Sequence, residues 1–151
     1  MAGFKFRLAA VLRLRQRIRE ERQWELRALN ERRNLLEAEI AELERELAGA
    51  DEALAGGIAT GFELRLHADY RNSLAARIAT RREALARLDG TLAEKRAAVV
   101  EALRGVKSLE QLRARLEEKS RYERELEERK IADEIGRREF SGTGRGKKLP
   151  R

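Results

Sequence analysis

The sequence contains one histidine and no cysteine, so few side chains are suited to catalysis or metal binding. His67 lacks the second histidine, the cysteines and the spaced acids that would complete a zinc site. We expect it to be a solvated or partly packed helix residue. The lack of cysteine also excludes disulfides, thiolate metal ligands and cysteine nucleophiles.

A second pattern with possible chemistry is the glycine-rich segment GGIATG at residues 56–61. A phosphate-binding loop would continue with Gly-Lys-Ser or Gly-Lys-Thr and would follow an apolar strand, and this segment does neither. The sequence therefore predicts no enzyme activity, no bound metal and no cofactor.

The elements that carry these residues are predicted to be long helices. Charged residues make up 40% of the chain and aromatic residues only 5%, which does not favour a globular core. Abundant Ala, Glu, Leu and Arg with apolar residues at helical spacing are typical of a coiled coil. Charges interrupt every apolar stretch near the N-terminus, so we expect no signal peptide, no transmembrane segment and a cytosolic protein.

Apolar residues recur in steps of three and four along two stretches, the pattern of a left-handed coiled coil, except at four positions of the pattern that are taken by Arg33, Arg81, Lys95 and Arg113. The first stripe is Leu26, Leu29, Leu36, Ile40, Leu43, Leu47, Ala50 and Leu54, and the second includes Tyr70, Leu74, Ile78, Leu85, Leu88, Leu92, Val99, Ala102, Val106, Leu109 and Leu116. Four glycines lie between them, at 49, 56, 57 and 61. Because glycine disfavours helix interiors, this cluster predicts a reversal of the chain.

The predicted fold is all-α, a two-stranded antiparallel coiled-coil hairpin whose second helix is longer than the first. The expected divisions are one hairpin domain over residues 4–140, with helix 1 at about 4–54, a turn at 55–61 and helix 2 at about 62–140, followed by a disordered basic tail over 141–151. A third helix after a turn at Gly105 is the alternative. We also expect alanine at Gly56 and Gly57 to disturb the reversal.

A fold-back near Ile58 would place residue i beside about residue 116 minus i, since both helices rise equally per residue. The second stripe should then lose its apolar residues beyond about position 116. The sequence agrees, because those positions become Ser120, Glu123 and Glu127. Residues 117–140 are therefore predicted to form a charged overhang that is either frayed or held by another protein.

The charge is unevenly distributed: residues 4–33 carry ten Lys or Arg against four Glu. A basic helix attracts anions, yet this one lacks the interleaved aromatic residues of a nucleic-acid binder. We therefore expect a solvated face or docking on an acidic protein surface, and no specific nucleic acid. Trp24 and Tyr122 are candidate interface anchors.

Four segments together resemble the FliJ family of flagellar type III export proteins: FKFRLAAVLRLRQRIRE at 4–20, DYRNSLAARI at 69–78, KSLEQLRAR at 107–115 and ADEIGRREF at 132–140. The resemblance implies an antiparallel coiled coil similar to the stalk of rotary ATPases. It also implies binding to the hexameric export ATPase, contact with the cytoplasmic domain of the export-gate membrane protein, and chaperone-like escort of export cargo or its chaperones. The expected location is the cytoplasm, peripherally associated with the inner membrane at the flagellar base.

The resemblance also implies two sets of contact residues. The ATPase-binding set is Arg13, Arg17, Trp24, Tyr122, Asp133, Glu134 and Arg137, and the export-gate set is Tyr70, Leu74 and Ile78. Three other functions stay open: the stalk of a virulence-type type III secretion system, a basic coiled-coil scaffold on nucleic acid or lipid surfaces, and a generic homodimeric scaffold.

Overall fold

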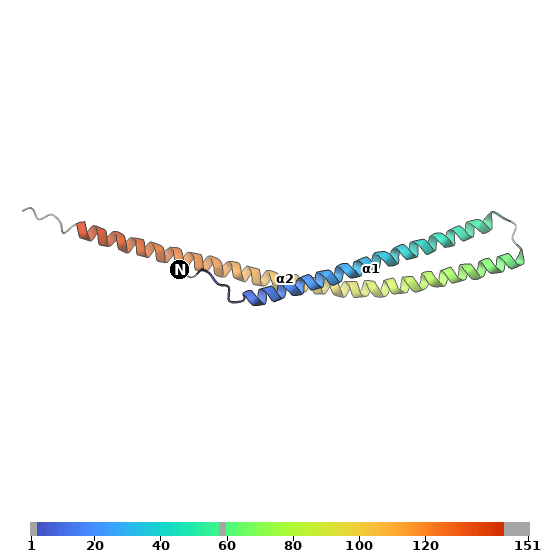
Figure 1. Ribbon diagram of the computed structural model, residues 1–151, viewed down its shortest axis with the longest axis horizontal. Helices are drawn as coiled ribbons and strands as arrows, with labels where there is room; N and C mark the ends of the chain where they lie inside the picture. The colour runs from blue at the N-terminus through green and yellow to red at the C-terminus, as the bar shows by residue number, and fades with distance from the viewer. Residues whose placement is uncertain (1–2, 58–59, 144–151) are drawn as a thin grey trace, which may run out of the picture. The chain divides into compact units, whose positions relative to one another are not determined.

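The computed structural model describes residues 3–57 and 60–143 and contains two α-helices. Helix α1 is Ala9–Ala55, with 47 residues, and α2 is Gly61–Thr143, with 83 residues. The two helices pack against each other as a hairpin (Figure 1), and the described residues contain no strand. The predicted all-α hairpin with a longer second helix is confirmed.

The helix ends differ from the expected ones by a few residues. Residues 3–6 have no regular structure and 7–8 form a turn, so α1 begins about five residues late. Helix α2 continues through Gly105 without a break, so the alternative of a third helix is wrong. It also includes residues 141–143, and the rest of the predicted tail lies outside the described residues.

A capping box starts α2 at Thr60. The Glu63 backbone N–H donates to Thr60 Oγ1 at 3.3 Å, and the Thr60 N–H donates to Glu63 Oε2 at 2.9 Å. These two bonds satisfy donors that the first turn of a helix leaves without intrahelical partners. The cap therefore fixes the residue at which the reversal ends and α2 begins, within a segment rich in glycine.

The chain divides into two compact units, which we call the terminal unit, residues 1–14 and 105–151, and the hairpin unit, residues 15–104. In the hairpin unit Leu43 packs with Leu74 and Ile78, and Leu47 covers the cluster. Ile40, Leu92 and Val99 are also buried in this unit. These residues all belong to the two predicted stripes, so the stripes form the contact between the helices.

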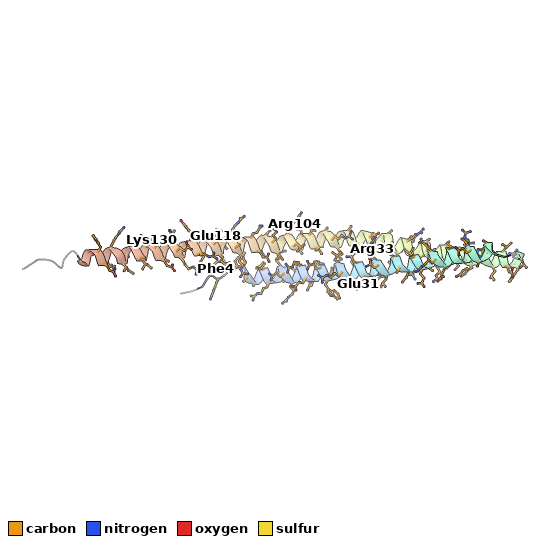
Figure 2. The ribbon with its side chains drawn as sticks, turned by 90° about the horizontal axis from the view of Figure 1, so that it is seen from above. Phe4, Glu31, Arg33, Arg104, Glu118 and Lys130 are labelled. Atoms are coloured by element: carbon orange, nitrogen blue, oxygen red, sulfur yellow. The ribbon has the colours of Figure 1, made fainter. Side chains whose placement is uncertain are left out.

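Several ion pairs join α1 to α2 in the hairpin unit: Arg33 with Asp89 at 2.7 Å, Glu25 with Lys95 at 2.9 Å, Glu39 with Arg81 at 3.1 Å, and Glu44 with Arg82. Figure 2 shows Arg33 on the side of α1 that faces α2, whereas Glu31 points away. The residue numbers of the four pairs add up to 122, 120, 120 and 126. Residue i thus lies beside about residue 120 minus i, about four residues beyond the expected register.

Burial in the terminal unit fades along α2. Leu12 and Val106 are buried, Leu112 and Leu116 are partly exposed, and Ser120 is the last partly covered residue. Every residue from 121 to 142 is exposed, although the segment stays helical. Burial along α2 therefore ends near the position at which the sequence predicts the end of the second stripe, and the helix continues beyond it.

Candidate protein-interaction surface

In the terminal unit, three of the predicted ATPase-binding residues share one face of α2. Asp133 and Arg137 follow Tyr122 by 11 and 15 residues, which turns them only about 20° and 60° around the helix. Tyr122 is 60% exposed, and it lines one surface depression, whereas Asp133 and Arg137 line another. We call Tyr122, Asp133 and Arg137 the α2 face.

The other two predicted residues of the terminal unit lie elsewhere. Glu134 points about 100° away from its neighbour Asp133. Its carboxylate accepts a hydrogen bond from Arg138 Nη2 at 2.8 Å, an i,i+4 pair that supports the helix. Arg13 is exposed on α1.

In the hairpin unit, Arg17 and Trp24 lie on α1 and both are exposed. They are seven residues apart, so they share a face of the helix. Trp24 is 69% exposed and lines a depression with Glu20, Glu21 and Glu25. An indole this exposed does not contribute to the packing between the helices and is available to a second protein.

The predicted export-gate residues are divided between the core and the surface. Leu74 is 1% exposed and Ile78 is 5% exposed, and both pack against Leu43. Their side chains hold the two helices together and are not accessible in the folded hairpin. Tyr70 is 48% exposed and remains accessible.

The sequence reading did not single out Phe62 and Leu66, which are 75% and 60% exposed at the start of α2. They precede Tyr70 by eight and four residues, so the three side chains share one face. The sequence signal for this face was the i,i+4 spacing of large apolar residues outside the two predicted stripes. The same spacing relates Tyr122 to Leu126 and Ile131 to Ile135, all exposed beyond the last partly covered residue, Ser120.

The ion pairs between the helices shift two pKa values. The hydrogen bond from Lys95 lowers the pKa of the Glu25 carboxyl, helped by the positive charges of Lys95 and Arg22. The hydrogen bond to Asp89 raises the pKa of the Arg33 guanidinium. Both shifts favour the charged form that the structure pairs.

His67 is partly buried, with its Nε2 3.4 Å from Asp51 Oδ1. Arg71 Nε approaches the same oxygen at 3.5 Å. Across residues 3–57 and 60–143, no group of three or more His, Cys, Asp or Glu is positioned to hold a metal ion. Within the same ranges, neither helix is apolar enough over a sufficient length to span a membrane.

These features define a helical-hairpin protein whose distinctive side chains are aromatic and charged residues exposed on two long helices. The family model described as the flagellar FliJ protein matches residues 4–145, nearly the whole chain. The chain therefore belongs to the FliJ family, as its motifs predict. No curated protein and no solved structure matched it in the other two comparisons.

Family membership makes this chain a component of the flagellar type III export apparatus. The family is a non-catalytic, cytoplasmic component of that apparatus. The helical hairpin described above is consistent with such a role, because both of its helices carry long exposed faces.

Proposed function

We propose that this protein is a stalk-like partner of the hexameric export ATPase and a chaperone-like escort for export cargo. One observation supports the stalk role above all: α2 remains helical to Thr143, although burial ends at Ser120. A helix without tertiary contacts is only marginally stable in water. Exposed apolar residues along this segment, Tyr122 and Leu126 among them, give it a surface that a second protein can cover.

The composition of the candidate surfaces suits a protein partner. The α2 face combines an exposed tyrosine with charges of both signs, and α1 adds Arg13, Arg17 and Trp24. Tyrosine, tryptophan and arginine are the residues most enriched among interface hot spots. A stalk that contacts ring subunits differently in their different nucleotide states would shift the populations of those states, without catalysing a reaction itself.

The same proposal assigns the export-gate contact to the start of α2. Tyr70 is the accessible member of the predicted set, and Phe62 and Leu66 extend its face. Leu74 and Ile78 would act indirectly, by holding this part of α2 against Leu43. Contact with the gate would place the protein at the inner membrane as a peripheral component.

The ATPase contact is tested by co-sedimentation with the cognate export ATPase hexamer and by measuring stimulation of ATP hydrolysis. We expect Tyr122→Ala to weaken both, because it removes an exposed aromatic anchor from the α2 face. Phe62→Ala is the matched control, since it removes an even more exposed aromatic residue from the other end of α2.

In a pull-down with the cytoplasmic domain of the gate protein, Phe62→Ala becomes the test variant and Tyr122→Ala the control. There Phe62→Ala and Tyr70→Ala are expected to weaken binding, whereas Tyr122→Ala is not. The stalk proposal fails if the unmodified protein neither sediments with the hexamer nor stimulates it at stoichiometric concentration.

A further inference from the structure

A groove runs between α1 and α2 in the middle of the hairpin unit, with a volume of about 430 Å³. Its floor consists of Leu29 and Leu36 from α1 and of Ala84 and Leu88 from α2. The three leucines belong to the predicted stripes and Ala84 adjoins the second one, yet each is only half-buried, in contrast to the fully buried Leu74 and Leu92. The apolar seam is therefore open to the outside along this flank.

The rim of the groove is basic. Arg32 of α1 and Arg81 and Arg87 of α2 line it, and the lining contains no acidic residue. Arg81 is paired with Glu39, whereas no ion pair of Arg32 or Arg87 is found among the described residues. Of the carboxylates close to them in sequence, Glu37 and Asp89 both pair with Arg33, and Glu31 and Glu83 form no ion pair within residues 3–57 and 60–143.

The two flanks of this part of the hairpin carry different charges, because neighbouring residues of a helix point in different directions. Arg33 follows Arg32 by one residue, so it points about 100° away around α1, and Asp89 points about 200° away from Arg87 on α2. The Arg33–Asp89 ion pair, 2.7 Å long, thus bridges the helices on the opposite flank. In the part of the chain that the structure describes, the guanidinium groups of Arg32 and Arg87 therefore lie beside an apolar floor without an ion pair.

We infer that this groove is a docking site for an acidic amphipathic helix of a partner protein, with large apolar residues on the floor and carboxylates on Arg32 and Arg87. The lining of α2 extends over eleven residues, Arg81 to Thr91, which corresponds to about 15 Å or about three helical turns. Helix-in-groove recognition uses apolar anchors at i, i+3, i+4 and i+7 over about this length. None of the residues assigned above to the ATPase or the gate lines the groove.

Charge complementarity selects this occupant over others. A basic helix would bring further cations against three guanidinium groups, and a purely apolar one would leave them desolvated without partners. Arginine also accepts carboxylates in a two-pronged hydrogen-bonding geometry, which fixes the orientation of a docked helix.

Fluorescence anisotropy with a labelled synthetic peptide of about 18 residues tests the inference. The peptide carries leucines at i,i+4 spacing and flanking glutamates, and its counterpart carries lysines in place of the glutamates. We expect the full-length protein to bind the acidic peptide and not the basic one. Arg32→Glu and Arg87→Glu should each weaken binding about tenfold.

Arg27→Glu and Arg96→Glu are the matched controls, because they make the same charge change on the same two helices outside the groove. They should leave binding of the acidic peptide unchanged. Ala84→Trp should block the floor, and circular dichroism checks that each variant keeps its helix content.

The inference is overturned if neither peptide binds, if both bind alike, or if the control variants weaken binding as much as the groove variants. Equal binding of a single-stranded oligonucleotide or of anionic phosphatidylglycerol vesicles, lost in the same two variants, would instead make the groove a general anion site. Self-association that Arg32→Glu abolishes in sedimentation would assign the groove to a second copy of the chain.

Discussion

Replacing Leu74 with alanine is expected to lower the free energy of unfolding of the hairpin unit by about 2 to 3 kcal/mol. Leu74 is 1% exposed and packs with Leu43 and Ile78, so almost its whole side chain leaves water when the helices pair. The substitution removes three carbon groups, or about 2.4 kcal/mol of transfer free energy at about 0.8 kcal/mol each. The cavity term should be small, because two helices close over a gap more easily than a globular core does.

The measurement is urea unfolding followed by far-ultraviolet circular dichroism, with Leu66→Ala as the matched control. Leu66 lies eight residues earlier on the same helix and is 60% exposed, so its replacement should change the free energy by less than about 0.5 kcal/mol. If both variants lose the same free energy of unfolding, or if Leu74→Ala loses none, Leu74 does not pack between the helices and the prediction is refuted.

This pair of variants also separates packing from partner binding. If Leu74→Ala weakens binding to the export gate, the loss should follow the fraction of unfolded hairpin and should be restored by conditions that stabilise the fold. Tyr70→Ala should weaken gate binding with a smaller loss of stability than Leu74→Ala, because Tyr70 is 48% exposed.

Three further predictions concern single positions. Because Lys95 lowers the pKa of Glu25 in the folded state, the stability from this pair is present above the ordinary value of 4.5 and is lost as the pH falls below it. Acid titration of the melting temperature should therefore show a smaller decline for Glu25→Gln than for the exposed control Glu31→Gln. Thr60→Ala should cost about 1 kcal/mol by removing the cap of α2, seen as faster hydrogen exchange in its first turn. Gly56→Ala should leave the melting temperature unchanged or raise it, and a fall of more than about 5 °C would contradict the backbone geometry.

The last of these reverses an expectation from the sequence. The glycine cluster predicts a reversal that depends on the conformational freedom of Gly56 and Gly57, yet no described glycine has a positive φ. A Cβ at Gly56 would meet its nearest neighbour at 3.8 Å, an ordinary contact, and one at Gly57 would meet nothing within 4 Å. The glycines mark the position of the turn correctly, and the Thr60 capping box ends it.

The candidate surfaces were predictable to different degrees. Trp24 and Tyr122 fall outside the apolar stripes, so helical periodicity alone predicts that they are exposed, and the structure agrees. Leu74 and Ile78 fall within the second stripe, and the structure buries them. The groove between Arg32 and Arg87 could not be found from either helix alone, because each contributes only half of the lining.

The sequence by itself determined that two helices form, where the chain reverses and where the apolar stripe of the second helix ends. Each of these depends on a local pattern, and helical periodicity and glycine placement are local properties. Only the tertiary structure decided the register, about four residues beyond the expected one, because a stripe of three- and four-residue steps does not specify which positions of the two helices meet. Specific ion pairs such as Arg33–Asp89 and the packing of Leu74 against Leu43 distinguish one register from the next, and they exist only once the two helices have met.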